Sequence, residues 1–260
     1  MPDTALITGA SGGIGEELAR LLAAGGANLV LVARGADRLT ALATELSRTH
    51  NVQAGVIAQD LSAPDAADAI AHELASRQLT IDILVNNAGF GVYGFFAATP
   101  AEEEARMMQV NIVALTTLTK RLLPGMIERR QGRVLNVAST AAFQPGPMMA
   151  VYYASKAYVL SLSEALSNET AGTGVTVTCL CPGPTETGFQ DRANLRESRL
   201  FSVLGAGSAA DVAQAGYDGM MAGEAIVIPG LGNRLGVQAI RFTPRALVRR
   251  VIRTIQSRRS

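Results

Sequence analysis

Short apolar segments alternate with segments of helical periodicity along almost the whole chain of 260 residues. We expect strands at Ala5–Thr8, Asn28–Ala33, Val52–Ala58, Ile81–Val85, Arg133–Ala138, Val175–Leu180 and Ala225–Ile228. A helix is expected directly after the first strand, and others at Asp37–Ser47, Asp65–Arg77, Glu102–Glu128, Tyr152–Glu169 and Ala209–Met221. Such alternation predicts right-handed βαβ units, and therefore an α/β fold with a parallel sheet covered by helices on both faces.

Composition is that of a globular chain, with 48% hydrophobic and 17% charged residues. Neither a long unbroken apolar run nor a basic start followed by an apolar stretch is present, so we expect a cytoplasmic protein. The only cysteines, Cys179 and Cys181, point to one face of an expected strand and are predicted to be buried thiols. His50 and His72 have no partners at metal-ligand spacing, so no metal site is predicted.

A glycine-rich turn follows the first expected strand and opens the first helix. It reads Thr8-Gly9-Ala10-Ser11-Gly12-Gly13-Ile14-Gly15. Glycines at such a turn let the backbone pass close to a diphosphate, and the following helix presents free N–H groups and the positive end of its dipole. Glycines also form ordinary turns, but this position in a βαβ unit is the one that a dinucleotide site requires. The turn therefore predicts dinucleotide binding.

Tyr152 and Lys156 stand four residues apart in an expected helix, and Ser139 lies thirteen residues before the tyrosine. Residues at this spacing share a helix face, so the Lys156 ammonium is expected beside the Tyr152 phenol, where it lowers the phenol pKa. The hydroxyl of Ser139 can donate to the same substrate oxygen that the tyrosine protonates. The set indicates redox chemistry between a carbonyl and an alcohol. Tyr153, three residues before Lys156, lies near the same face and is the alternative acid, and a Tyr–Lys pair alone is an ordinary surface feature.

Five ordered motifs resemble those of the short-chain dehydrogenase/reductase family, from the start of the chain to about residue 230. The glycine turn has the spacing G-x-x-x-G-x-G, which departs from the commoner G-x-G-x-x-G and is similar to that of the family. The five motifs are Gly9, Gly13 and Gly15 of the turn, Asn86-Asn87-Ala88-Gly89, Asn111 in Val110-Asn111-Ile112, Ser139 with Tyr152 and Lys156, and the Pro-Gly loop Cys181–Thr187.

The resemblance implies a doubly wound Rossmann fold in residues 1–240, with seven strands in the order 3-2-1-4-5-6-7. It also implies that Asn111 holds a water for proton relay, Ser139 orients the substrate oxygen, Tyr152 is the acid/base and Lys156 binds the nicotinamide ribose. A homodimer or homotetramer formed through the helices Glu102–Glu128 and Tyr152–Glu169 is a further implication. The cofactor is then expected against Gly9, Ser11, Gly13, Ile14, Gly15, Asp60, Leu61, Asn86, Ala88, Gly89, Lys156, Pro182, Gly183, Thr185 and Thr187.

The end of the second strand bears on the choice of cofactor. Folds that select NAD usually place a carboxylate there for the adenosine ribose hydroxyls, whereas an arginine suits the 2′-phosphate of NADP. This chain has Ala33-Arg34 and no acid, and Arg38 follows one helical turn later. We therefore expect NADP(H) to be favoured over NAD(H); the alternative is that Arg34 only caps a surface helix. Asp60 is either the family's adenine contact or the start of a turn.

Aromatic residues and methionines gather in the segments that family analogy places near the nicotinamide. They favour an apolar ketone, aldehyde or secondary alcohol as the small-molecule substrate, although core packing or a subunit interface explains some of them equally well. Residues 188–207 are expected to form a lid over the site. The side chains concerned are Phe90, Tyr93, Phe95, Phe96, Phe143, Met148, Met149 and Phe189.

The end of the chain is strongly basic, because eight arginines and no acid follow Glu224. From Pro244 onward apolar residues recur at helical spacing between arginines, so residues 241–260 are expected to form a basic amphipathic extension. Such a helix either packs on the body or on another subunit, or makes weak peripheral contact with an anionic membrane. Nucleic-acid binding is not expected, because the tail has no interleaved aromatics and the body is acidic.

These observations favour an NADP(H)-dependent oxidoreductase that moves a hydride between nicotinamide and a carbonyl or alcohol carbon. One alternative is an NAD-dependent alcohol dehydrogenase. The other is a nucleotide-binding regulator that docks through its basic C-terminal helix, and the complete set Asn111, Ser139, Tyr152 and Lys156 argues against it.

Overall fold

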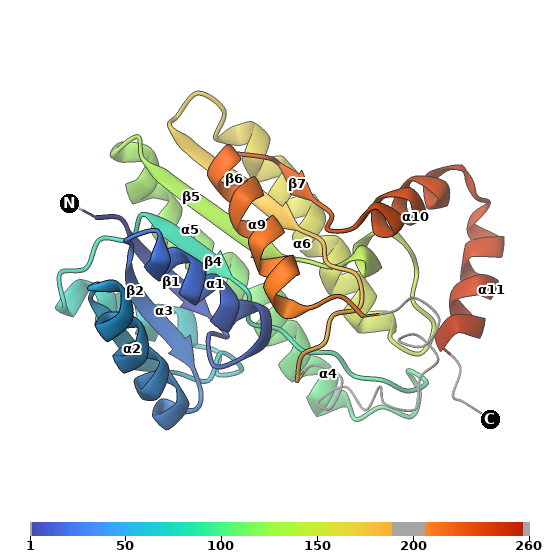
Figure 1. Cartoon of the computed structure of the whole chain (residues 1–260). Helices are drawn as coiled ribbons and strands as arrows, with labels where there is room; N and C mark the ends of the chain where they lie inside the picture. The colour runs from blue at the N-terminus through green and yellow to red at the C-terminus, as the bar shows by residue number, and fades with distance from the viewer. Residues whose placement is uncertain (1, 189–205, 257–260) are drawn as a thin grey trace.

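The computed structural model describes residues 2–188 and 206–256, and within them seven parallel strands form one sheet (Figure 1). The strands are β1 (Thr4–Thr8), β2 (Asn28–Ala33), β3 (Ala54–Ala58), β4 (Ile83–Asn86), β5 (Gly132–Val137), β6 (Val175–Leu180) and β7 (Ile226–Val227). Their order is β3-β2-β1-β4-β5-β6-β7, which confirms the predicted order 3-2-1-4-5-6-7. The chain changes direction across the sheet between β1 and β4, the place where open α/β sheets bind ligands.

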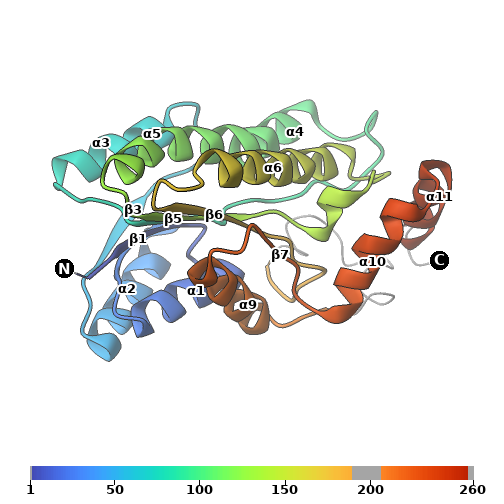
Figure 2. The same cartoon turned by 90° about the horizontal axis from the view of Figure 1, so that it is seen from above.

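Helices cover both faces of the sheet, as Figure 2 shows. One face carries α1 (Gly13–Ala24), α2 (Ala36–His50) and α9 (Ala209–Ala222), and the other carries α3 (Ala66–Ser76), α4 (Ala101–Met108), α5 (Leu115–Glu128) and α6 (Ala150–Glu169). Each face has its own cluster of buried apolar side chains, with Leu18 and Leu39 in one and Ile70 and Leu118 in the other. The strands are therefore buried on both sides, which explains their continuous apolarity.

The long helix expected at Glu102–Glu128 is not regular throughout. Between α4 and α5 the chain forms a π-helical segment, η1 (Gln109–Ala114), and this segment contains Asn111. A π-helical turn holds an extra residue in its hydrogen-bonded ring and is frequently found at functional sites. The apolar pattern continues through this segment, so periodicity alone did not reveal it.

Two helices end the described chain and extend beyond the sheet, at the side of the molecule where α6 begins (Figures 1 and 2). They are α10 (Leu231–Phe242) and α11 (Arg245–Gln256). The sequence predicted α11 but not α10, in which two glycines weaken the helical signal. Because α10 continues to Phe242, the break between the two helices falls at Thr243 rather than at the expected boundary, residue 240. Across the described ranges, no helix is both long enough and apolar enough to cross a membrane.

Candidate active site

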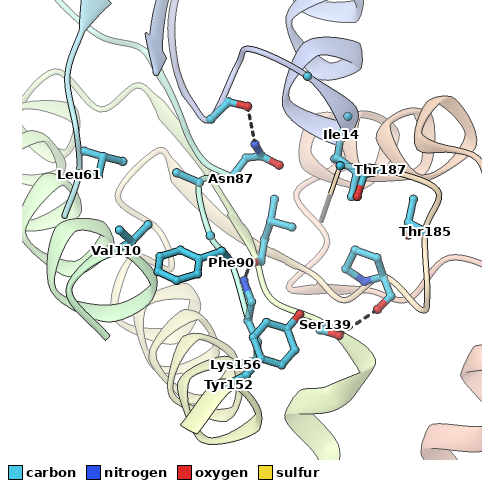
Figure 3. Close-up of a pocket in the computed structure, with 18 of the residues that line it drawn as sticks. Ile14, Leu61, Asn87, Phe90, Val110, Ser139, Tyr152, Lys156, Thr185 and Thr187 are labelled. Atoms are coloured by element: carbon cyan, nitrogen blue, oxygen red, sulfur yellow. Dashed lines mark hydrogen bonds between the residues drawn. The ribbon is translucent and has the colours of Figure 1, made fainter. Parts of the chain in front are cut away.

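A cavity of about 710 Å³ lies at the carboxyl ends of the strands (Figure 3). The turn after β1, the ends of β2, β4 and β5, the first half of α6 and the loop after β6 all contribute to its wall. The fold thus brings together motifs that are far apart in the sequence. The predicted residues that line the cavity are Gly9, Ser11, Gly13, Ile14, Arg34, Arg38, Asp60, Leu61, Ala88, Gly89, Ser139, Tyr152, Lys156, Pro182, Gly183, Thr185 and Thr187.

The turn after β1 needs glycine for two reasons. Gly9 and Gly13 have φ angles of 67° and 58°, in the left-handed region that side chains disfavour. A Cβ atom on Gly9 would also lie 2.9 Å from the Cα of Ala88, and one on Gly13 would lie 2.9 Å from a methyl of Thr187. Helix α1 begins at Gly13, and no side chain caps its first N–H groups. The turn therefore leaves room and backbone donors for a phosphate beside the cavity.

Asn87 also lines the cavity, although the sequence analysis did not select it. Its side-chain amide donates hydrogen bonds to the carbonyl oxygens of Thr8 at 3.0 Å and Gly9 at 3.2 Å, and its backbone N–H donates to the hydroxyl of Thr8 at 3.0 Å. Asn87 thereby fixes the glycine turn to the end of β4, as Figure 3 shows. Its place in the Asn-Asn-Ala-Gly motif was the only sequence signal for this role.

The end of the cavity beside β2 and β3 is rich in arginine. Arg34 and Arg38 line it as predicted, and Arg106 of α4 joins them from the other face of the sheet. Glu103 also lines the wall, but its carboxylate is paired with Arg106 at 2.9 Å. This end is therefore electropositive and suits a phosphate ester. Arg106 was missed because it follows the second strand by more than seventy positions.

Asp60 lies at the end of β3, and its carboxylate accepts hydrogen bonds from the backbone N–H of Ser62 at 3.0 Å and from the Ser62 hydroxyl at 2.9 Å. The backbone hydrogen bond is the main reason that the pKa of Asp60 is lowered, with help from the nearby charges of Arg34 and Arg106. The turn that the sequence offered as an alternative role is present, and Asp60 lines the cavity as well.

Ser139 and Tyr152 meet at the other end of the cavity. The Ser139 hydroxyl donates to the carbonyl of Pro182 at 3.3 Å and accepts from the backbone N–H of Ala141 at 3.1 Å, so its oxygen is fixed (Figure 3). Burial raises the pKa of Tyr152 to about 12, and a hydrogen bond with Ser139 opposes that rise. At neutral pH the phenol is therefore protonated and can act as an acid.

Lys156 is buried behind the tyrosine. Its ammonium donates a 2.7 Å hydrogen bond to the carbonyl of Val137 and lies 5.9 Å from the centre of the Tyr152 ring. Burial lowers the pKa of Lys156 to about 8. The lowered pKa that was expected for Tyr152 beside Lys156 is not found, because burial raises it. The ammonium of Lys156 is bonded to a backbone carbonyl rather than to the phenol oxygen.

Asn111 lies directly behind this end of the cavity and is almost completely buried. Its side-chain oxygen accepts from the N–H of Phe90 at 3.1 Å, and its amide donates to the carbonyl of Phe90 at 3.0 Å and to the hydroxyl of Ser155 at 3.1 Å. It therefore links the loop after β4 to α6. A Cβ atom on Gly89 would meet both Asn111 and Lys156, so these two side chains are close to the same backbone position.

Three predicted site residues do not line the cavity: Gly15, Asn86 and Asn111. Gly15 packs against the carbonyl of Gly9, where a Cβ atom would come within 2.5 Å of the oxygen. The buried amide of Asn86 donates to Thr119 at 3.0 Å and to Asn136 at 2.9 Å, which ties β4 to β5 and α5. In this structure Asn86 therefore holds the sheet together rather than facing the cofactor cavity.

The loop after β6 closes one side of the cavity. Pro182, Gly183, Thr185 and Thr187 all line it, and the Thr185 hydroxyl donates to the carbonyl of Gly183 at 2.9 Å. Of the lid expected at residues 188–207, positions 189–205 lie outside the described residues. Thr185 forms a single parallel bridge with Gly207, just after the described chain resumes at residue 206.

The predicted apolar walls are partly confirmed. Phe90 and Met149 line the cavity, together with Tyr153. Phe95 and Phe96 are exposed, and Phe143 packs against the buried cluster that contains Val159. Tyr93 lies beside Met148, and Phe189 lies outside the described residues. Gln256, at the end of α11, was not predicted to be near the site, yet its amide donates a hydrogen bond to the Tyr153 hydroxyl.

No cluster of three or more potential metal ligands occurs in the part of the chain that the structure describes. The two ends of the cavity instead match a dinucleotide: a glycine turn and arginines at one end, and an acid with an oriented hydroxyl at the other. A glycine turn, phosphate-binding arginines and a protonated phenol beside a hydroxyl are the parts that nicotinamide-dependent oxidoreductases use to bind a dinucleotide and to protonate a carbonyl oxygen.

Comparison with known proteins identifies the family. The sequence model described as "short chain dehydrogenase" matches residues 3–198, and this chain belongs to the short-chain dehydrogenase/reductase family. A very-long-chain 3-oxoacyl-CoA reductase of Aspergillus clavatus is 37% identical over 175 residues, which cover 66% of this chain and 51% of the relative. The chain thus spans about half the length of that curated relative.

Solved structures of the family have both kinds of cofactor. A short-chain dehydrogenase from Sphingobium yanoikuyae in complex with NADPH has a TM-score of 0.82 and 33% identity, covering 92% of this chain and 95% of that one. A short-chain dehydrogenase/reductase from Burkholderia phymatum in complex with NAD has a TM-score of 0.80 and 26% identity, covering 91% and 92%. Both neighbours therefore hold a nicotinamide cofactor, while the cofactor bound differs between them.

Proposed function

We propose that this protein is an NADP(H)-dependent carbonyl reductase for a ketone or aldehyde with an apolar substituent, with the reverse alcohol oxidation as the same chemistry run backwards. The observation that carries the proposal is one continuous cavity with arginines at one end and the Ser139–Tyr152 pair at the other. A cytoplasmic location and a homo-oligomer are parts of the same proposal.

The cavity residues fit such a cofactor. Gly9, Gly13 and the uncapped start of α1 would hold the diphosphate, and Lys156 the nicotinamide ribose. Arg34 and Arg38 would pair with a 2′-phosphate, because guanidinium groups bind phosphate through paired hydrogen bonds and no acid stands at the end of β2.

When bound, the reduced nicotinamide supplies the hydride that the carbonyl carbon accepts. Tyr152 gives its phenolic proton to the carbonyl oxygen, so hydride and proton together convert C=O into CH–OH. The raised pKa of Tyr152 keeps this proton in place at neutral pH. The Ser139 oxygen is held in place by the N–H of Ala141. Its single hydroxyl proton would turn from the carbonyl of Pro182 to the substrate oxygen as negative charge develops there. The ammonium of Lys156 lies 5.9 Å from the centre of the Tyr152 ring, so its positive charge would stabilise the phenolate that this proton transfer leaves.

The substrate class rests on the cavity wall. Phe90, Met149 and Tyr153 are apolar or amphipathic and lie at the same end as Ser139 and Tyr152. An apolar substituent beside the carbonyl would bury its surface against them. The name of the Aspergillus clavatus relative, a reductase of very-long-chain 3-oxoacyl groups, describes such a substrate and supports this choice.

The homo-oligomer rests on exposed apolar side chains along the outer side of α4, η1, α5 and α6. Their exposure on these neighbouring helices favours pairing with a second copy, as burial of apolar surface drives association. They are Met108, Val113, Ile127 and Tyr158.

The proposal is tested by titrating the purified protein with NADPH and NADH and then measuring turnover of a panel of aliphatic and aromatic ketones and aldehydes. We expect tighter binding of NADPH and faster reduction as the apolar substituent grows. Tighter binding of NADH would favour the NAD-dependent alternative. Binding of NADPH with no turnover of any carbonyl would favour the regulator, and binding of neither nucleotide would overturn the proposal.

A further inference from the structure

The two C-terminal helices expose large apolar side chains to solvent. On α10, Leu231, Leu235 and Phe242 recur at helical spacing opposite the buried Val237, and Phe242 is 88% exposed. On α11, Leu247 and Val251 are exposed as well. We call these five exposed residues the C-terminal apolar surface. A surface helix normally turns its apolar side to the core, so an apolar stripe pointing away from the core indicates an external contact.

The same helices carry a dense positive charge. Three arginines, Arg245, Arg249 and Arg253, follow one another at four-residue intervals on α11. Each is followed two positions later by an apolar residue, so the arginines and these apolar residues lie on opposite sides of the helix. Arg241 and Arg250 add to this charge, and no acid follows Glu224. In the described ranges these arginines make no ion pair with an acidic side chain, although Arg253 lies 5.9 Å from the ring of Phe95. The exposed Phe95 adds apolar area next to α11.

We propose that α10 and α11 form a binding surface for an anionic lipid bilayer, here called the lipid-binding surface. Interfacial helices combine arginine on one side with leucine and phenylalanine on the other, so that apolar side chains enter the headgroup region while arginines pair with anionic lipids. The exposed Leu231, Leu235 and Phe242 supply the first part, and the arginines of α11, which form no ion pair within the described residues, supply the second.

Other occupants fit less well. A two-fold pairing of this surface with a second copy would bring the arginines of both α11 helices together, and like charges repel. Nucleic acid would use the arginines but would leave the leucines and phenylalanines of α10 in water, because phosphate contacts do not bury them. A lipid surface satisfies both sets of side chains.

Helix α11 lies between the lipid-binding surface and the candidate active site. Its inner side packs on the substrate end of the cavity: Ile252 contacts the cluster that contains Met149, Tyr152 and Tyr153. At its end, the carbonyl of Gln256 accepts a hydrogen bond from the Tyr93 hydroxyl. One helix thus separates the proposed lipid surface from the place where an apolar substrate would bind.

The test is flotation of the full-length protein with vesicles of pure phosphatidylcholine and with vesicles that also contain phosphatidylglycerol. We expect binding to the anionic vesicles that weakens as salt is added. The Arg245→Gln/Arg249→Gln variant removes two charges and should reduce the partition coefficient by roughly 30-fold, at about fivefold for each arginine. The Leu235→Ser/Phe242→Ser variant should reduce it by at least about 10-fold.

Matched controls lie on other faces of the molecule. Arg48→Gln/Lys120→Gln also removes two exposed charges, and Met221→Ser also removes an exposed apolar side chain; both should bind vesicles like the unchanged protein. Circular dichroism and nucleotide binding establish that each variant is folded. Equal losses in the control and test variants, or no binding to anionic vesicles at low salt, would overturn the proposal. Self-association without lipid that only the C-terminal variants abolish would assign the surface to a second copy and overturn it as well.

Discussion

Replacement of Tyr152 by phenylalanine separates the catalytic acid from its neighbour, because Tyr153→Phe is a matched control one position away. Both hydroxyls lie at the substrate end of the cavity, but they have different partners. Tyr152 interacts with Ser139, whereas Tyr153 accepts a hydrogen bond from the amide of Gln256. If Tyr152 is the acid, its loss should lower kcat/KM for carbonyl reduction by about 10²- to 10⁴-fold, the usual contribution of a positioned proton donor.

The structure also predicts the effect on stability. Without the Tyr152 hydroxyl, Ser139 still donates to Pro182 and accepts from Ala141, so no buried polar group is left without a partner. Tyr152→Phe should therefore cost at most about 1 kcal/mol, or roughly 2–4 °C in Tm. Tyr153→Phe removes the acceptor of the Gln256 amide, whose oxygen Oε1 already has no hydrogen-bond partner among the described residues, so it should cost more stability.

The assay combines oxidation of the reduced nicotinamide, a nucleotide titration and a thermal melt for both variants. We expect Tyr152→Phe to bind nucleotide normally and lose turnover, and Tyr153→Phe to keep at least a tenth of its turnover while melting earlier. Retention of more than a tenth of the activity by Tyr152→Phe would refute its role as the acid. A loss in folded Tyr153→Phe as large as that in Tyr152→Phe would point to Tyr153 instead.

Three further predictions concern the cofactor end, the glycine turn and the buried lysine. Arg34→Ala/Arg38→Ala should raise the Kd for NADPH at least about 10-fold and leave that for NADH nearly unchanged, as titration can measure, because only the 2′-phosphate contacts are lost. Gly13→Ala should weaken nucleotide binding because its φ is 58°, whereas Gly12→Ala, which has nothing within 4 Å of the added Cβ, should bind normally in the same titration. Burial lowers the pKa of Lys156 from 10.5 to about 8, so between these pH values the unfolded chain binds one more proton than the folded chain. The free energy of unfolding therefore rises with pH over this range. The contribution of Lys156 to stability is complete above pH 10.5 and is lost as the pH falls to about 8. Urea unfolding should therefore show the wild type gaining about 1.4 kcal/mol per pH unit relative to Lys156→Met between pH 8 and 10.5, and parallel stabilities over this range would contradict it.

Local signals were sufficient for the sheet and for most of the cavity. Strand order followed from the family motifs, and the glycine turn was recognisable because a strand, glycines and a helix stand next to one another in the sequence. Tyr152, Lys156 and Ser139 were found by their spacing. The charge states of these groups could not be found in that way: the pKa of Tyr152 depends on burial beneath elements that come from several parts of the chain. Sequence proximity to Lys156 suggested a lowered value, and burial reverses it.

Residues that act across long separations were the ones missed. Asn86 was expected to contact the cofactor because it begins the Asn-Asn-Ala-Gly motif, yet its amide donates a hydrogen bond to Asn136, fifty positions later. Gln256 reaches Tyr153 across 103 positions, by way of α10, whose glycines hide it from pattern analysis. Neither contact has a local signature, because each depends on how complete helices and strands pack together.

The distribution of these contacts separates two parts of the site. The nucleotide end is built from β1 to β4 and their turns, which lie within the residues that match the family. The substrate end also depends on α11, which lies beyond that match and supplies Ile252 and Gln256 to the wall behind Tyr153. Since α11 has an apolar inner side against the cavity and an arginine-rich outer side, changes in it would alter substrate choice and surface binding together while nucleotide binding stays unchanged. Specificity in this chain is therefore to be sought first in its C-terminal helices, where the family motifs have no residues.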